Sequence, residues 1–306
     1  MHTAITIDAL KVLDAIDRKG SFAGAAAALF RVPSAISYTV QKLEEDLNVS
    51  IFDRSGHKAV LTPAGRYLLD EGRSLLAAAE NLAHTTRQVA QGWETRLRIG
   101  FNALLPAECL FPAIQDFLQL GVPVEVQIIE EVFAGAWDAL QSRRVDLVVG
   151  ADQLSKPAGS FATRKLGEIP FVFAVAPRHP LASTSAPLSD NEIARYTSVA
   201  AADTSRTLPP GHAGIFQRQH TLTVTNIDQK IAAQEAGLGV GWLPTPRVAE
   251  ALAAGRLVAR EVENPRSSVA VYLARHETDQ GKALMWFWDR LTSDEGLTKW
   301  LQPSPV

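Results

Sequence analysis

The first fifty residues alternate apolar and polar positions at the spacing of three successive α-helices. Residues 5–19 place an apolar stripe opposite a polar one, which predicts a first helix. A second helix is expected after Ser21, whose hydroxyl suits an N-cap, and its alanines let a neighbouring helix pack closely. Pro33 fits the first turn of a third helix, where its missing N–H is no loss. The apolar stripe of that third helix consists of Ile36, Val40, Leu43 and Leu47.

The polar side of the third helix carries groups that suit nucleic acid: Ser34, Ser37, Tyr38, Gln41 and Lys42. Hydroxyl, amide and ammonium groups read base edges and hold phosphates. An ordinary solvated helix would show the same face. Two short apolar runs at residues 51–54 and 59–62 flank a basic turn, however, and predict a hairpin. In a winged helix-turn-helix, Arg54, His57 and Lys58 of this hairpin would lie near the DNA backbone or minor groove.

A single long helix is predicted from Pro63 to Gln91, with Thr62 as its N-cap. At the usual rise it extends about 40 Å, which is more than a small winged domain needs. Apolar and small residues recur along it in alternating four- and three-residue steps: Leu68, Gly72, Leu75, Ala79, Leu82, Thr86 and Val89. This spacing favours packing against a second copy, with Leu68, Leu75, Ala79 and Leu82 in the dimer seam. Packing of the same face on its own domain is the alternative.

After Gly92, short apolar runs alternate with helical segments. The first unit has predicted strands at 97–101, 124–129 and 146–150, with helices at 107–119 and 134–143. The second has predicted strands at 171–176, 197–201, 222–225 and 239–243, with a helix at 228–236. After a further strand at 269–274, the helix at 282–291 is expected to return and pack on the first unit. This α/β alternation predicts a mostly parallel sheet, two lobes and a ligand cleft between them.

The composition of the chain limits the possible classes of function but does not identify one. The chain has 306 residues, 46% of them hydrophobic, and a net charge of −3, which indicates two or three domains. Residues 1–62 hold as many acidic as basic side chains, so charge alone does not predict DNA binding. Cys109 is the only cysteine and the histidines are scattered, so we expect no disulfide, metal or cofactor. The lack of a long apolar run predicts a cytoplasmic protein without membrane contact.

Five short motifs follow one another along residues 5–65. They are Gly20-Ser21-Phe22 with Ala25-Ala26, Ser34-Ala35-Ile36-Ser37, Leu43-Glu44, Ile51-Phe52-Asp53-Arg54 and Leu61-Thr62-Pro63-Ala64-Gly65. In this order they resemble the DNA-binding domain of LysR-type transcriptional regulators, with a narrower similarity to the YhaJ-type members elsewhere in the chain. Tyr38 and Thr39 depart from the Arg-Gln that is common in the family, which leaves the bases that are read open.

The resemblance implies an α/β protein of three parts. These are a winged helix-turn-helix DNA-binding domain at 1–62, a linker and dimerisation helix at 63–92, and a periplasmic-binding-protein-like effector domain at 93–306. Lobe I of that domain is expected at about 93–160 and 275–306, and lobe II at about 161–274. The full DNA-facing set becomes Ser21, Arg31, Pro33, Ser34, Ser37, Tyr38, Thr39, Gln41, Lys42, Arg54, His57 and Lys58.

In the family, the effector lies between the lobes. Carried over by segment, lobe I offers Asn102, Ala103, Leu104, Val132 and Phe133, and lobe II offers Asp203, Thr204, Arg206, Asn226 and Ile227. Arg206 is the expected partner of an anionic group, unless it pairs with an acid on the surface. An aromatic pocket of Phe101, Phe133 and Trp242 is a second expectation, with burial of these rings in the core as the alternative.

The implied function is regulation of transcription without catalysis. The implied partners are double-stranded promoter DNA, a small-molecule effector that is aromatic or quinone-like, a second copy in dimers and tetramers, and RNA polymerase. An enzyme or a small-molecule binding protein using the same cleft is the rival class. The chain shows no phosphate-binding loop, dinucleotide fingerprint or nucleophile elbow. A purely architectural DNA binder would not need residues 95–303.

Overall fold

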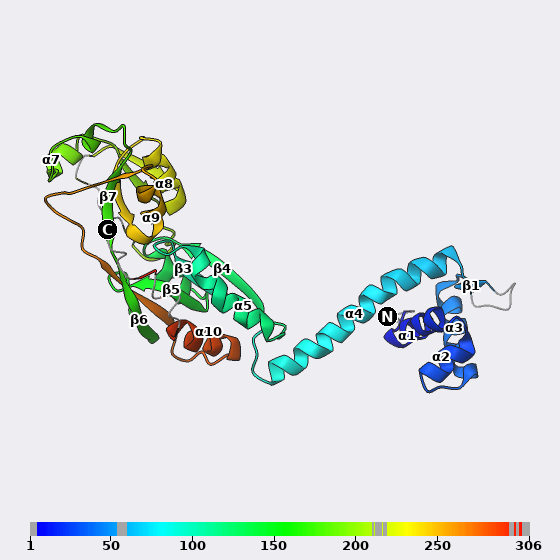
Figure 1. Ribbon diagram of the computed structural model, residues 1–306. Helices are drawn as coiled ribbons and strands as arrows, with labels where there is room; N and C mark the ends of the chain where they lie inside the picture. Colours follow the sequence, from blue (N-terminus) through cyan, green and yellow to red (C-terminus); the bar gives the residue numbers. More distant parts are fainter. Residues whose placement is uncertain are drawn as a thin grey trace. The chain divides into compact units, whose positions relative to one another are not determined.

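The computed structural model describes residues 5–53, 60–209, 211, 216, 219–293, 297, 300 and 301. It divides into two compact units, residues 1–91 and 92–306, hereafter unit 1 and unit 2. Both are drawn in Figure 1. Within the described residues, no helix has the length and apolar character that crossing a membrane requires.

Unit 1 consists of three short helices, a two-stranded hairpin stem and a long helix. Its elements are α1 (Ile7–Lys19), α2 (Phe22–Ala28), α3 (Pro33–Leu47), β1 (Phe52–Asp53), β2 (Val60–Leu61) and α4 (Pro63–Ala90). Thr6, Ser21 and Thr62 cap α1, α2 and α4 through their hydroxyls, as N-cap residues do. The predicted apolar stripes of α1 and α3 meet in one core, which Phe52 of β1 closes against Phe22 at a ring distance of 5.2 Å.

The hairpin of the predicted wing is present at its base, where β1 pairs antiparallel with β2. Glu44 of α3 fixes the chain at this point, because one carboxylate oxygen accepts from the amides of Ile51 and Phe52 at 2.7 and 3.1 Å. The predicted basic tip with Arg54, His57 and Lys58 lies outside the described residues.

Lobe I of unit 2 is built on a five-stranded sheet in the order β4-β3-β5-β12-β6. Its elements are β3 (Arg96–Asn102), η1 (Ala107–Leu110), α5 (Phe111–Gln119), β4 (Glu125–Glu131), α6 (Gly135–Gln141), β5 (Leu147–Asp152), β6 (Phe161–Ile169), β12 (Val269–His276) and α10 (Lys282–Thr292). β3 runs parallel to β4 and β5, as predicted. As also expected, α10 returns to this lobe, where Phe287 packs 4.9 Å from Phe117 of α5.

Lobe II contains a small antiparallel sheet in the order β10-β7-β11 and the parallel pair β8-β9. Its elements are β7 (Phe171–Val175), η2 (Pro180–Ala182), α7 (Asp190–Ile193), β8 (Ser198–Ala201), β9 (Thr221–Val224), α8 (Ile227–Glu235), β10 (Gly241–Pro244), α9 (Thr245–Ala253) and β11 (Val258–Arg260).

The boundary between the lobes differs from the sequence interpretation. Residues 161–169 and 269–274 were expected in lobe II, but β6 and β12 pair antiparallel with each other inside the lobe I sheet. The chain therefore enters lobe II at Pro170, directly after β6, and leaves it before β12. Lobe I thus comprises residues 92–169 and 269–301, and lobe II residues 170–268. The antiparallel pairing also makes the sheet less parallel than expected.

Candidate nucleic-acid interface and inter-lobe site

The exposed side of α3 carries the polar residues that the sequence places there. Ile36, Val40 and Leu43 are buried, and the opposite face leaves Ser34, Ser37, Tyr38, Gln41 and Lys42 exposed. Val32, the N-cap, makes no side-chain capping bond. Pro33 has no N–H, and the amides of Ala35 and Ile36 donate to the Val32 carbonyl at 3.0 and 3.5 Å. The Ser34 amide remains for an acceptor such as a phosphate oxygen, which a helix N-terminus favours.

Three other residues of the expected DNA-facing set have local roles. Ser21 accepts from the Gly24 amide at 3.0 Å, and the Thr39 hydroxyl donates to the Ala35 carbonyl at 3.0 Å. Arg31 forms a two-pronged ion pair with Asp8 at 2.8 and 2.6 Å, and this hydrogen bonding lowers the pKa of the Asp8 carboxyl. Because the pair is exposed, it contributes little to stability, and Arg31 can exchange it for a phosphate at small cost.

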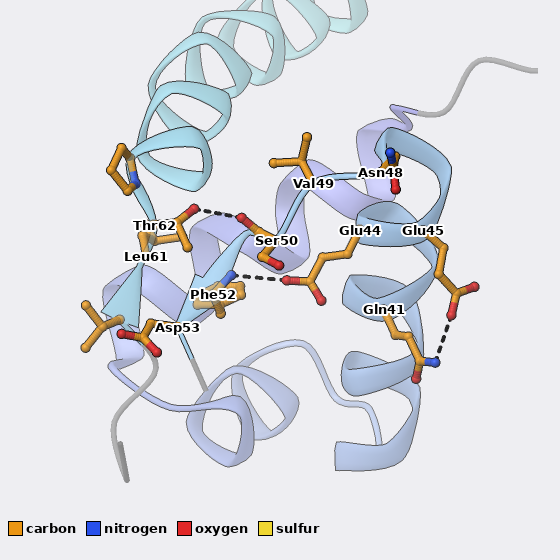
Figure 2. A pocket seen from close by; sticks show the side chains of 12 residues that line it. Gln41, Glu44, Glu45, Asn48, Val49, Ser50, Phe52, Asp53, Leu61 and Thr62 are labelled. Carbon is orange, nitrogen blue, oxygen red and sulfur yellow. Dashed lines mark hydrogen bonds between the residues drawn. The ribbon is translucent and has the colours of Figure 1, made fainter. Parts of the chain in front are cut away.

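A groove of about 840 Å³ lies between the carboxyl-terminal half of α3 and the hairpin stem. Figure 2 shows Glu44 reaching from α3 to the Phe52 amide, and Thr62 bonding to the Ser50 carbonyl. Glu45, which accepts from Gln41 at 2.8 Å, and Asp53 also line the groove. Three carboxylates disfavour a phosphate backbone, so of the described residues that line this groove only Gln41 belongs to the candidate interface.

The long helix α4 packs on its own unit only at its beginning. Leu69 and Gly72 are buried, and a side chain at Gly72 would collide with Leu10 of α1. Leu68 is partly buried at the same core. Further along, the apolar seam lies in the open: Leu75 is 53% exposed and Leu82 is 70% exposed. Packing on its own domain is therefore confirmed for the beginning of the helix, while packing of the exposed part against a second copy stays a prediction.

In unit 2, the expected effector residues meet where the lobes touch. Ala103 and Val132 of lobe I form an apolar cluster with Ala201 and Ile227 of lobe II, and Phe133 packs against its edge. Next to this cluster, the Thr204 hydroxyl bonds with the Glu131 carboxylate and accepts from the Val132 amide at 2.9 Å. A side chain on Gly135 would collide with Thr204, so this close approach requires glycine at that position.

The remaining members of the expected set differ in their surroundings. Asn102 is buried and accepts from the Leu104 amide at 3.1 Å, while Asn226 caps α8 by accepting from Gln229. Asp203 accepts from the amides of Ala134 and Ser205 at 3.2 and 2.7 Å. Arg206 is exposed.

The expected aromatic pocket does not form as one cluster. Phe101 is buried in the lobe I core, whereas Trp242 packs 5.5 Å from Phe173 in the lobe II core. Of the three aromatic residues, only Phe133 lies at the contact between the lobes.

Two inter-lobe contacts were missed by sequence reasoning. Arg144 of lobe I bonds to Glu131 and Asp138 at 2.6 and 3.0 Å, and Asp138 accepts from the amides of Thr207 and Leu208 of lobe II at 2.8 and 3.0 Å. Burial opposes ionisation of Asp138, but these hydrogen bonds outweigh it and hold the pKa of that carboxyl well below its usual range. No local pattern in the sequence signals partners so far apart along the chain.

The second missed contact is Arg247 of α9. Its guanidinium donates to the carbonyls of Ala103 and Leu105 in lobe I at 3.0 and 2.9 Å, and it also pairs with Asp228. Arg247 lines an inter-lobe pocket of about 560 Å³ together with Glu108, Glu130 and Asp228. Burial raises the pKa of the Glu130 carboxyl, and the negative charge of Asp228 adds to this rise. The positive charge of Arg247 opposes it only in part.

Comparison with protein families identifies both parts of the chain. Residues 7–66 match the bacterial regulatory helix-turn-helix protein family described as lysR, and residues 90–295 match the LysR substrate binding domain. The probable HTH-type transcriptional regulator YhaJ of Escherichia coli K12 is 43% identical over 283 residues, which cover 92% of this chain and 94% of that protein.

Solved structures show the same fold. The OxyR C206 mutant of Corynebacterium glutamicum aligns with a TM-score of 0.59 at 17% identity, covering 96% of this chain and 92% of that one. Full-length LysG of Corynebacterium glutamicum with bound effector Arg aligns with a TM-score of 0.52 at 23% identity, covering 98% and 100%.

Proposed function

This chain belongs to the LysR family of DNA-binding transcriptional regulators, and we propose that α3 reads promoter DNA while the contact between the lobes of unit 2 senses a small-molecule effector. It is a regulator with an effector-binding domain rather than an enzyme. The proposed division assigns DNA binding to residues 1–62, dimerisation to 63–92 and effector binding to 93–306.

The observation that carries the DNA part is the exposed polar face of α3. Ser34, Ser37 and Gln41 present hydroxyl and amide groups on one side of a helix whose other side is core. Two such helices in a dimer would enter successive major grooves of a partly palindromic site. Arg54, His57 and Lys58 of the wing are proposed to add backbone contacts.

The effector part rests on the meeting of Val132, Thr204 and Ile227 between the lobes. An effector that binds one lobe arrangement better than another shifts the population of that arrangement. From the family resemblance, we further propose that the protein forms tetramers. Effector binding would then change the bending of promoter DNA and the recruitment of RNA polymerase. Phe133 is the aromatic residue at the contact between the lobes, and it supports the proposal of an aromatic or quinone-like effector.

Operator affinity tests the DNA part. We expect Ser37→Ala to weaken binding to genomic fragments recovered by footprinting by about 1–3 kcal/mol, because a hydroxyl contact in the groove is lost. Electrophoretic mobility shift at fixed salt measures this. Ser74→Ala, an equivalent change on the exposed side of α4, serves as the control and should leave affinity unchanged. Unchanged affinity in Ser37→Ala, Tyr38→Ala and Gln41→Ala would show that this face does not read DNA.

A further inference from the structure

The buried face of α8 in lobe II is unusually polar. The helix turns four residues inward, Ile227, Lys230, Ala233 and Gln234. Lys230 is 6% exposed and Gln234 is fully buried. Lysine and glutamine are seldom buried without partners, because removing a charge or an amide from water is costly unless hydrogen bonds replace it.

The polar groups on this face lack such partners within the part of the chain that the structure describes. Both side-chain polar atoms of Gln234 are buried without a hydrogen bond. No described residue forms an ion pair or hydrogen bond with the Lys230 ammonium. Burial, followed by the charge of Arg266, lowers the pKa of Lys230 to about 8. The positive charge of Arg266 thus acts on Lys230, and no described acid forms an ion pair with either cation.

Arg266 belongs to the segment that leads back to lobe I. Burial lowers the pKa of its guanidinium, which stacks on the Phe171 ring with 3.8 Å between its central carbon and the ring centroid. The stacking fixes the plane of the guanidinium and leaves its edge free to bond an acceptor in that plane.

Lys230 and Gln234 lie close together at a glycine. A Cβ on Gly241 of β10 would lie 3.1 Å from Gln234 Nε2 and 3.6 Å from Lys230 Cε. The amide and the lysine stem therefore border the same point, which any larger residue would fill.

Several other buried charges of unit 2 have partners of opposite charge. Glu131 and Asp138 share Arg144, and Arg247 pairs with Asp228. The cluster of Lys230, Gln234 and Arg266 is different, because it combines two cations and an amide donor with no carboxylate. A ligand that carries negative oxygen atoms would supply the missing acceptors.

We propose that Lys230, Gln234 and Arg266 form an anion site in lobe II that binds a small oxyanion, such as a carboxylate. The ammonium and the amide donate to its oxygen atoms, and Arg266 supplies the second charge. This inference rests on the effector-sensing role proposed for unit 2 and gives the chemical class of the ligand. It places the anion partner at a buried lysine rather than at the exposed Arg206.

Thermal unfolding of the full-length protein tests the site. Sodium acetate, benzoate and phosphate are titrated separately at constant ionic strength, at a pH below the Lys230 pKa of about 8. We expect at least one of them to raise the Tm saturably, and the three arms distinguish carboxylates from phosphate. Lys230→Met should need at least about tenfold more anion for the same rise, because a charged hydrogen bond is lost. Without anion, its Tm should not fall, since an unpaired buried charge has been removed.

Three variants make the result specific. Lys165→Met removes an exposed lysine of lobe I and should respond to anions as the wild type does. Gln234→Leu keeps the shape of the side chain and should weaken the anion response several-fold. Arg206→Met tests the rival position. Loss of the response in Arg206→Met with retention in Lys230→Met would overturn the proposal.

The proposal is also overturned if no anion stabilises the wild type, or if Lys230→Met lowers the Tm without anion and keeps the full response. Operator binding of the same samples separates this failure from that of the proposed function. A wild type that binds operator DNA but no anion refutes only the anion site, whereas a wild type that binds no DNA refutes the DNA-reading role.

Discussion

Asp138 and Lys230 are both buried, yet the folded protein favours the charged form of Asp138 and disfavours the charged form of Lys230. Hydrogen bonds from Thr207, Leu208 and Arg144 outweigh burial at Asp138, and its pKa falls far below the ordinary value. At Lys230, burial and Arg266 both disfavour the charged form, and the pKa falls to about 8. In both cases, the number and sign of the neighbouring groups decide which form of the side chain the folded protein prefers.

The shifted pKa of Lys230 predicts a dependence of stability on pH. Between about pH 8 and 10.5, the folded chain releases this proton while the unfolded chain keeps it. The unfolded state therefore binds more protons, and stability rises with pH, by about 3 kcal/mol over this window. In chemical denaturation at several pH values, Lys230→Met should lack this rise.

Lys165→Met provides the matched comparison, because Lys165 is an exposed lysine paired with Glu168. It should keep the rise between pH 8 and 10.5 that the wild type shows. A Lys230→Met variant that kept the same rise would show that another group releases the proton.

Residue roles were predictable only where the local pattern determines them. The stripe of Ile36, Val40 and Leu43 follows from helical periodicity, and Ser21 from the chemistry of an N-cap. Lys230 is different, because a lysine in a helix ordinarily points to solvent, and the packing of α8 on β8 and β10 makes its face an interior one. Arg206 was expected as the anion partner instead, because the family resemblance placed its segment at the ligand and a guanidinium binds anionic groups well.

At the level of elements, α4 combines two kinds of packing in one helix. Its first turns belong to the unit 1 core through Leu69 and Gly72, and its later turns present Leu75, Leu82 and Val89 to solvent. A row of exposed apolar side chains on a helix of 28 residues is typical of a surface that a second helix covers.

Leu75→Glu is therefore expected to separate the proposed dimer, because it puts a charge into an apolar seam. Sedimentation velocity should show a monomer, and operator affinity should fall by at least about a hundredfold through lost bivalency. Ser74→Glu adds the same charge at the neighbouring exposed position and should remain dimeric. A Leu75→Glu protein that sediments as a dimer would rule out this seam.

Most elements could be predicted because their signals are local. The long helix ends at Ala90, one residue from the expected end, since Thr62 and Pro63 define its start and the apolar period defines its course. The membership of β6 and β12 could not be predicted, because a strand's sheet is decided by pairing with remote strands. The lobe boundaries were therefore displaced, although the two-lobed arrangement was predicted.

At the scale of unit 2, polar contacts join the two lobes at separate places. One is the bonding of Asp138 to Thr207 and Leu208, and another is the bonding of Arg247 to the carbonyls of Ala103 and Leu105. Sequence patterns predicted two lobes but not these contacts, whose partners are about 70 to 140 positions apart.

Arg247→Met should loosen the contact between the lobes, because two buried carbonyl acceptors lose their donor. We expect faster hydrogen–deuterium exchange around residues 103–105, measured by mass spectrometry on the full chain. Arg256→Met is the matched control, since Arg256 pairs with Glu235 and Glu250 in an exposed position within lobe II. Equal exchange at residues 103–105 in both variants would mean that Arg247 does not hold the lobes together.

Thr204 already occupies the polar groups of Glu131 and Val132 before any ligand arrives. A molecule entering there must displace this threonine, so its measured affinity is the difference between two sets of bonds. Tight binding then requires a ligand whose bonds to Glu131 and Val132 are stronger than those of Thr204. For an effector at the proposed site, the protein thus supplies an internal competitor, and the ligand concentration needed for a response depends on the Thr204 contact as well as on the ligand.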